Sequence, residues 1–216
     1  MAIDPTLRDA LSAVTPASLA RALTRAGVKA FTPHGLSARG SGAVVGPAYT
    51  MRMIPARDDA AGDLAAAIDA VPDGAVVVID AAASGLALPF GAILAARLAQ
   101  RGAVGLVTDA ALPDEIGIPA WSRPAAAGGT LALVGTQERV ACGGAAIHPG
   151  DILVCESTGI VAVPAAIAER VALEAVEQQR LDLWIQREVE RGATLASLLP
   201  PDAAALARFE AETKPV

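Results

Sequence analysis

Apolar side chains recur along the chain with two different spacings. Near both ends they recur every three or four residues, which is typical of amphipathic helices. In the middle they form short unbroken runs, such as Val76–Ile79, which are typical of strands covered on both faces. The first half of the chain therefore predicts helices at 6–14 and 16–28, a loop at 32–42, one strand with a break or two short strands at 43–56, a helix at 63–71, a strand at 75–80, a helix at 89–102 and a strand at 103–109.

The last three of these elements follow one another directly. A strand, a helix and a second strand in succession predict a parallel crossover of right-handed sense. The carboxyl ends of both strands then lie at one edge of the sheet, which is the edge where ligands of open α/β sheets gather. Asp109 stands at the end of the second strand and Gly91 at the start of the helix, so both are expected near that edge.

The second half of the chain alternates short apolar segments with Gly and Pro. These segments predict strands of antiparallel or barrel-like arrangement at 117–121, 130–135, 138–147, 151–157 and 159–164. A long amphipathic helix is predicted at 165–192, with Gly192 at its end, and a proline-containing tail follows. No internal repeat or linker divides the chain, so we expect a single α/β domain over residues 1–216.

Composition narrows the classes of partner. The net charge is −6, from 17 basic and 23 acidic residues, which argues against nucleic acid as the main partner because phosphate binding needs a basic face. The apolar runs are too short to span a membrane and the N-terminal residues do not resemble a signal peptide, so we expect a cytoplasmic protein. Cys142 and Cys155 lie in apolar segments and are expected to be buried, reduced thiols.

The reactive side chains leave few kinds of chemistry. His34 and His148 are the only histidines and lie far apart, so no zinc-ligand spacing exists, and no nucleophile elbow, Walker loop or dinucleotide-binding fingerprint is present. Carboxylates remain: Asp114 and Glu115 follow the strand that ends at Asp109. Carboxylate oxygens suit a hydrated Mg²⁺ or Mn²⁺, and the first amides of the helix at Gly91 suit an anion. The alternative is that Pro-Asp-Glu forms the first turn of a helix and binds no metal.

The order of motifs resembles the RraA-like family, which holds divalent-metal 4-hydroxy-4-methyl-2-oxoglutarate aldolases and regulators of ribonuclease E activity. The resemblance rests on "GPAYTMR", "GAVVVID", "FGAILAARLAQRGAVGLVTDAALPD" and "CGGAAIHPGDILVCESTGIVAVP", and it covers nearly the whole chain. It implies a swivelling β/β/α domain with a mixed sheet core, flanking helices and a C-terminal helix. It also implies a homo-oligomer, either a trimer or a hexamer built as a dimer of trimers.

The resemblance carries functional residues onto one loop. In the family's Asp-Gly-x-x-Arg-Asp stretch the last Asp binds the metal and the Arg grips the substrate. Asp109 matches the first Asp and Asp114 the last, whereas Ala110 replaces the Gly and Pro113 replaces the Arg. Proline cannot reproduce the bidentate grip of arginine on a carboxylate. In the preceding loop Gly91 matches the family, while Ala92 stands where an acid is frequent.

The implied reaction is retro-aldol cleavage or oxaloacetate decarboxylation, in which a metal polarises a small α-keto acid and stabilises the pyruvate enolate. Asp114 would hold Mg²⁺ or Mn²⁺, and Asp109 and Arg123 are the catalytic candidates. The predicted substrate-binding residues are Gly91, Ala92, Ile93, Pro113 and Arg97. Arg123 or Arg97 would replace the missing guanidinium, although each is also explained as an ordinary surface arginine.

Two further hypotheses stay open. The first is a non-catalytic oligomeric regulator or binding protein, which the replacement by Pro113 favours and whose acidic surface suits a basic partner. The second is an enzyme of the same fold that takes a substrate without the carboxylate, in a neutral pocket around Leu112 and Pro113.

Overall fold

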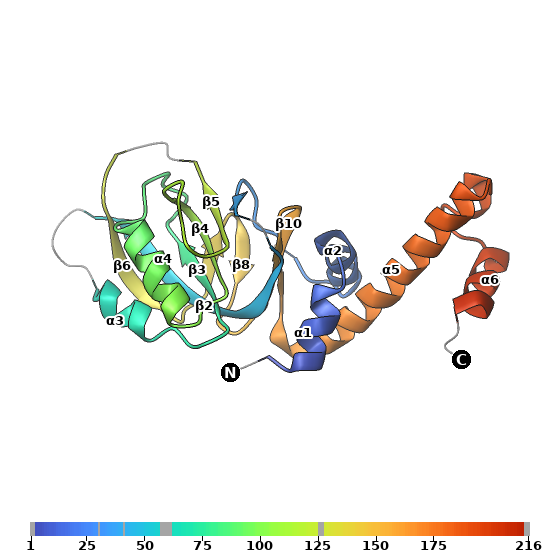
Figure 1. Ribbon diagram of the computed structural model, residues 1–216, viewed down its shortest axis with the longest axis horizontal. Helices are drawn as coiled ribbons and strands as arrows, with labels where there is room; N and C mark the ends of the chain where they lie inside the picture. Colours follow the sequence, from blue (N-terminus) through green and yellow to red (C-terminus); the bar gives the residue numbers. More distant parts are fainter. Residues whose placement is uncertain (1–2, 30, 41, 57–61, 125–127, 214–216) are drawn as a thin grey trace.

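The computed structural model describes residues 3–29, 31–40, 42–56, 62–124 and 128–213, which form a twisted mixed sheet flanked by helices (Figure 1). The strands are β1 Ser37–Arg39, β2 Val44–Pro55, β3 Val76–Asp80, β4 Gly105–Ala111, β5 Ala120–Arg123, β6 Leu131–Thr136, β7 Val140–Cys142, β8 Ala145–Ile147, β9 Ile152–Glu156 and β10 Gly159–Val163. The α-helices are α1 Pro5–Ser12, α2 Pro16–Arg25, α3 Leu64–Asp69, α4 Gly91–Gln100, α5 Ala168–Glu190 and α6 Ala203–Thr213.

The main sheet has the strand order β1-β5-β4-β3-β2-β9-β10, with β6 also paired to β2. The central strands β2, β3, β4 and β5 run parallel to one another, which confirms the predicted parallel crossover through α4. The other pairings in this sheet are antiparallel. β5 differs from the prediction, because it pairs in parallel with β4 on one side and antiparallel with β1 on the other.

β2 joins the two parts of the sheet. The sequence left open whether residues 43–56 form one strand or two, and the structure shows one continuous strand, Val44–Pro55. Its first residues pair with β9, and residues 48–52 pair with β3. A side chain at Gly46 is excluded, because an added Cβ would lie 2.4 Å from the carbonyl oxygen of Gly74. Glycine therefore lets β2 cross close to the neighbouring turn.

Apolar side chains cover both faces of the sheet. One face packs against α3 and α4, the opposite face carries the β7-β8 hairpin, and the end formed by β9 and β10 packs against α1, α2 and α5. Cys142 and Cys155 are buried and free, as expected. The parallel strands are buried along their whole length, which explains the unbroken apolar runs in their sequences.

Local sequence fixes the helix ends. Asp4 and Thr15 cap α1 and α2 by accepting hydrogen bonds from backbone amides, and each is followed by proline at the first helical position. Gly27, Gly102 and Gly192 follow α2, α4 and α5 with positive φ angles of 77°, 86° and 97°. Gly102 and Gly192 are the last residues of the helices predicted at 89–102 and 165–192, so these two predicted ends are confirmed. Glycine adopts the left-handed conformation without steric cost.

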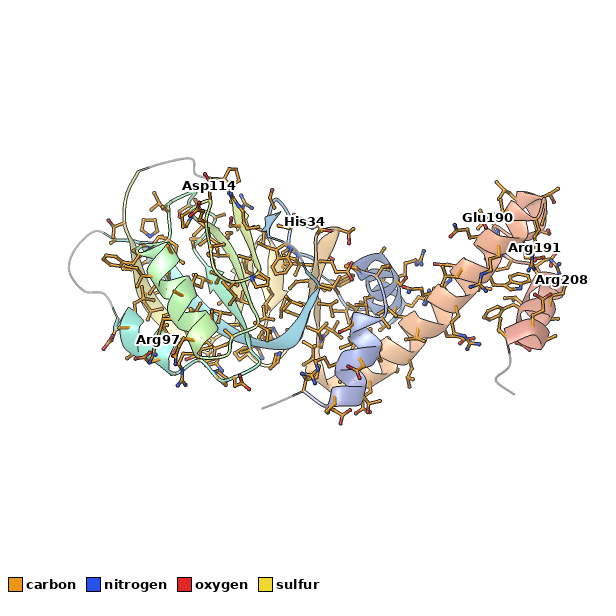
Figure 2. All side chains as sticks on the ribbon, in the orientation of Figure 1. His34, Arg97, Asp114, Glu190, Arg191 and Arg208 are labelled. Carbon is orange, nitrogen blue, oxygen red and sulfur yellow. The ribbon has the colours of Figure 1, made fainter. Side chains whose placement is uncertain are left out.

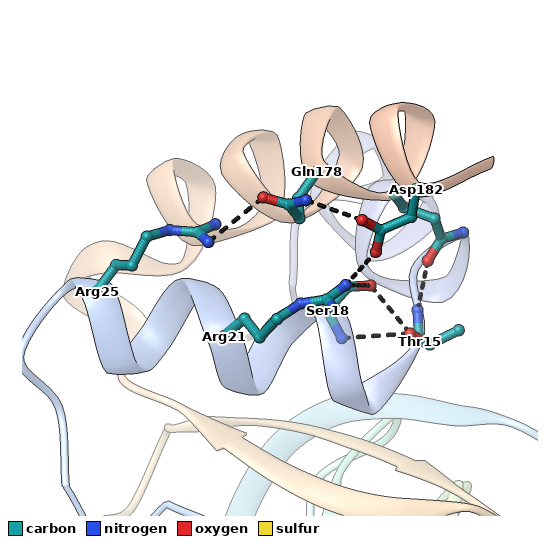
Figure 3. Close-up of polar contacts among 7 residues, drawn as sticks. Thr15, Ser18, Arg21, Arg25, Gln178 and Asp182 are labelled. Atoms are coloured by element: carbon teal, nitrogen blue, oxygen red, sulfur yellow. Dashed lines mark hydrogen bonds and ion pairs between the residues drawn. The ribbon is translucent and has the colours of Figure 1, made fainter. Parts of the chain in front are cut away.

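The helix α5 extends away from the sheet, and α6 packs near its far end (Figure 1). α2 is tied to α5 by polar contacts: Arg21 pairs with Asp182, and Arg25 donates from Nη1 to Oε1 of Gln178 over 3.4 Å (Figure 3). The sequence predicted only a tail after α5, and the structure corrects this, because Phe209 of α6 packs against Trp184 in a small separate core. Among the described residues, no helix is long and apolar enough to cross a membrane.

Candidate active site

The carboxyl ends of β3, β4 and β5 meet at one edge of the sheet, and the loop 112–119 leaves β4 there. Asp114 stands in this loop near the tip of the sheet (Figure 2). No helix begins at Pro113, so the alternative in which Pro-Asp-Glu forms a first helical turn is wrong. Asp114 and Glu115 therefore do not complement a helix dipole, and their presence in this loop needs another explanation.

Asp114 is an exposed carboxylate with one basic neighbour. Its side chain is 98% exposed, and Oδ1 accepts a hydrogen bond of 3.1 Å from Nη1 of Arg39. Arg39 ends β1, and its Nε donates to the buried Oγ of Ser122 over 3.3 Å. Among the described residues Oδ2 of Asp114 has no hydrogen-bond partner, so this oxygen is available to a ligand.

The N-terminus of α4 lies against the same loop. A Cβ added to Gly91 would lie 3.0 Å from Cδ of Pro113, so these two predicted site residues are in close contact. The amide of Gly91 already donates to the carbonyl oxygen of Leu88 over 3.2 Å. The amides of Ala92 and Ile93 belong to the first helical turn, where the helix itself offers no acceptor. The structure thus brings the predicted anion-binding turn beside the predicted metal loop.

Asp109 occupies a different environment from Asp114. It is 1% exposed, and its two oxygens accept hydrogen bonds from the amides of Ala81 and Ala83 over 2.6 and 3.0 Å. Ala82 and Ala83 have positive φ angles of 55° and 51°, so Asp109 holds a turn that alanine rarely adopts. Burial is the main cause that raises the pKa of Asp109. This geometry favours a structural role for Asp109, whose side chain is buried and does not belong to the exposed loop of Asp114.

A second carboxylate supports the same turn. Asp80 accepts hydrogen bonds from the amides of Ala82, over 2.8 Å, and of Ala141 in β7, over 3.2 Å. Asp80 and Asp109 together therefore fix the backbone that leads from β3 toward α4. The sequence predicted that the strand ends at Asp109, whereas β4 continues to Ala111. The sequence also had no signal that distinguishes a buried carboxylate with a structural role from a reacting group.

The structure does not bring Arg123 to Asp114. Residues alternate between the two faces along a strand, so Arg123 lies on the face of Trp121, and Ser122 lies on the opposite face with Arg39. The guanidinium of Arg123 lies near Gly35, whose added Cβ would be 3.7 Å from Nη2. Its buried Nε has no hydrogen-bond partner among the described residues.

Arg97 is also distant from the loop. It lies toward the opposite end of α4 from Gly91 (Figure 2), and its Nε donates to Oδ1 of Asp69 in α3 over 2.6 Å. This ion pair joins α3 to α4, so Arg97 is explained by helix packing. The guanidinium nearest Asp114 comes instead from Arg39, which the sequence placed in a loop with no assigned role.

A divalent metal would find a sparse donor set here. Among the described residues, no group of three or more His, Cys, Asp or Glu side chains is placed to hold an ion. Asp114 offers one free carboxylate oxygen, and Glu115 beside it is also exposed. Such a site fits an ion that keeps most of its water and that the substrate helps to hold, which is a common way of binding Mg²⁺.

Known proteins resemble this chain in both sequence and fold. Residues 5–162 match the model of the family described as RraA-like, Aldolase/RraA. The "Putative 4-hydroxy-4-methyl-2-oxoglutarate aldolase" of Halalkalibacterium halodurans is 30% identical over 153 residues, which cover 68% of this chain and 71% of that protein.

Two solved structures share the fold over most of their length. An uncharacterized protein from Pseudomonas syringae superposes with a TM-score of 0.78 at 26% identity, covering 91% of this chain and 94% of that one. RraAS2 of Streptomyces coelicolor, described as an unusual member of the RNase ES inhibitor RraA protein family, gives 0.74 at 27% identity, covering 89% and 99%. The chain belongs to the RraA-like family, whose members include both aldolases and ribonuclease regulators.

Proposed function

We propose that the protein is a divalent-metal-dependent lyase that acts on small α-keto acids, of the 4-hydroxy-4-methyl-2-oxoglutarate aldolase or oxaloacetate decarboxylase type. The observation that carries this proposal is the contact between two elements of the site. The loop of Asp114, which has a free oxygen, packs against the N-terminus of α4 through Pro113 and Gly91. This contact supports the proposal, because a cation ligand and an anion-binding turn would then lie side by side.

Each residue has a defined part in this proposal. Asp114 would hold Mg²⁺ or Mn²⁺, directly or through water. The amides of Ala92 and Ile93 receive the negatively charged oxygens of the keto acid at the positive end of α4. Asp109 holds the turn that precedes the helix. The ion, when bound, supplies Lewis-acid polarisation of the substrate's keto group.

In oxaloacetate the bond between C3 and C4 breaks, carbon dioxide leaves, and the electron pair is withdrawn toward the keto oxygen. A solvent proton then completes pyruvate at C3. The exposure of Asp114 leaves the site open to that solvent.

A second function is favoured by two observations. Pro113 stands where the family's aldolases carry arginine, and Asp114 is already paired with a guanidinium. Neutralising that carboxylate weakens its attraction for a cation. A non-catalytic regulator or binding protein, resembling RraAS2 in fold, would need neither substrate nor metal. Its signature is stable binding to a protein partner without turnover.

The two functions are separated by a direct assay. The full-length protein is incubated with oxaloacetate or 4-hydroxy-4-methyl-2-oxoglutarate and millimolar Mg²⁺ or Mn²⁺, and pyruvate is measured with lactate dehydrogenase and NADH. We expect pyruvate release above the metal-catalysed background, and we expect EDTA to abolish the excess. Folded protein that releases no pyruvate above background with either substrate would overturn the lyase proposal.

We also propose that the protein assembles as a homo-oligomer, a trimer or a hexamer. Two apolar side chains beside the site support this: Phe90 is 73% exposed and Ile93 is 68% exposed. Exposed apolar groups that lie together at a functional edge are typical of a contact surface. Light scattering during size-exclusion chromatography measures the mass, and a monomer would contradict the proposal.

A further inference from the structure

We propose that the guanidinium of Arg39 binds the carboxylate of the keto-acid substrate. It would take the place of the family's arginine, which is proline at position 113 in this chain. The inference rests on the proposed function and names a residue that determines substrate binding at the same site. The sequence offered Arg123 and Arg97 for this part. Neither is placed beside Asp114, whereas Arg39 is 3.1 Å from it.

The register of β1 places Arg39 on the correct face of the sheet. Arg39 pairs with Ala120 of β5, and Ala120 in turn pairs with Leu106 of β4. Both partners belong to the apolar core that α4 covers. The side chain of Arg39 therefore rises on the same side as α4, whose N-terminus forms the other half of the proposed site.

Arg39 is held in place and still has donors to spare. Its side chain is only 25% exposed, and Ser122, which is fully buried, accepts a hydrogen bond from Nε. Nε and Nη1 each donate one hydrogen bond to a described residue, so three of the five N–H groups have no acceptor there. Two parallel N–H groups of this kind match the geometry of a carboxylate.

Stability does not explain the ion pair. Asp114 is 98% exposed, and a pair with so exposed a partner is screened by water and contributes little to folding. The arrangement instead resembles the family motif with its arginine moved to another strand. The metal-binding acid stays on the loop, and the cation reaches the same place from a neighbouring strand 75 positions earlier in the chain.

The test compares Arg39→Ala and Arg39→Lys with the wild type in three measurements. These are kcat/KM for oxaloacetate with Mg²⁺, the Kd of oxalate at saturating Mg²⁺, and the Kd of Mg²⁺ alone, the last two by titration calorimetry. The matched control is Arg52→Ala. Arg52 lies on β2 and forms an ion pair with Glu138, and strands β3 and β4 separate β2 from β5 in the sheet.

We expect Arg39→Ala to weaken oxalate binding and to lower kcat/KM by about 10- to 100-fold, the effect of losing charged hydrogen bonds. Lysine keeps the charge but not the fork, so Arg39→Lys should fall between wild type and alanine. The Kd of Mg²⁺ should stay unchanged or decrease, since Asp114 loses a competing cation. Arg52→Ala should match the wild type in all three measurements.

A double variant tests whether Arg39 takes the place of the family's arginine. Arg39→Ala combined with Pro113→Arg returns a guanidinium to the family's position and should recover oxalate binding and turnover to within about threefold of wild type, closer than Arg39→Ala alone. Thermal unfolding confirms that each variant is folded. This recovery also excludes a general loss of structure as the cause of the defect in Arg39→Ala.

Three results would overturn the inference. Arg39→Ala could leave oxalate binding unchanged, or it could raise both Mg²⁺ affinity and turnover, which would make the ion pair a lock on Asp114. The double variant could also fail to recover although it is folded. Failure of the proposed function is a separate outcome: a wild type without turnover refutes the lyase, whereas oxalate binding that depends on Arg39 would still support the carboxylate site.

Discussion

Two aspartates five positions apart in the chain show how differently one residue type is used in the two regions that meet at this edge of the sheet. Asp109, two residues before the end of β4, is 1% exposed and accepts hydrogen bonds only from backbone amides among the described residues. Asp114, on the loop that follows, is 98% exposed and keeps one oxygen free of described partners. The difference teaches that burial commits the first carboxylate to backbone hydrogen bonds, whereas exposure leaves the second open to a ligand from solvent.

Burial decides between these two uses. A carboxylate removed from water must find donors in the protein, and the left-handed turn at Ala82 and Ala83 provides them. A carboxylate in water has no such requirement and can exchange its water for an ion. The expected consequences are separable, because one residue should control stability and the other should control ligand binding.

The largest expected effect is on stability. Asp109→Ala leaves the buried amide of Ala81 and the part-buried amide of Ala83 without acceptors, so the free energy of unfolding should fall by about 3 kcal/mol. Urea unfolding followed by circular dichroism measures this change. Asp114→Ala is the matched control and should change stability by less than about 0.5 kcal/mol. Equal effects of the two variants would remove the distinction between the two regions.

The next effect is on ligand binding. Asp114→Asn removes the charge with little change of shape, so it should weaken Mg²⁺ binding and lower the rate of pyruvate release by about 100-fold. Titration calorimetry and the pyruvate assay measure the two quantities. Glu115→Gln, the exposed neighbour, serves as the control and should have a smaller effect. Unaltered Mg²⁺ uptake in Asp114→Asn would show that the loop is not the metal anchor.

The smallest effect concerns pH. Burial raises the pKa of Asp109 above its ordinary value of 3.8, so the folded state holds this proton more tightly than the unfolded state. The carboxyl then contributes stability that is fully present below pH 3.8 and is lost as the pH rises through the folded pKa. As the pH rises through the folded pKa of Asp109, the free energy of unfolding of the wild type should therefore fall relative to that of Asp109→Asn, which cannot ionise. Urea unfolding of both proteins from about pH 4 to about pH 7 measures the difference. A difference that is constant across this range would contradict the prediction.

The amino-acid sequence by itself determined the elements whose signals are local. Helix spacing, caps and glycine stops located α1 to α5, and unbroken apolar runs located β3 and β4 with their parallel crossover. The family motifs and the loop of Asp114 were also readable, since each is a continuous stretch of chain. The sequence missed β1 within a Gly-rich segment and α6 beyond two prolines, and it predicted one strand at 138–147 where the structure has the hairpin of β7 and β8. Both β1 and α6 are stabilised by contacts with distant residues, which leave little trace in their own sequence.

Only the tertiary structure decided which charged groups meet. Arg39 reaches Asp114 because β1 pairs with β5 in one register, and a shift of one residue would turn its side chain to the other face. The same alternation sends Arg123 away from the loop, and helix packing engages Arg97 with Asp69. Sequence distance does not measure distance in a sheet, since strand pairing brings together positions that no local pattern connects.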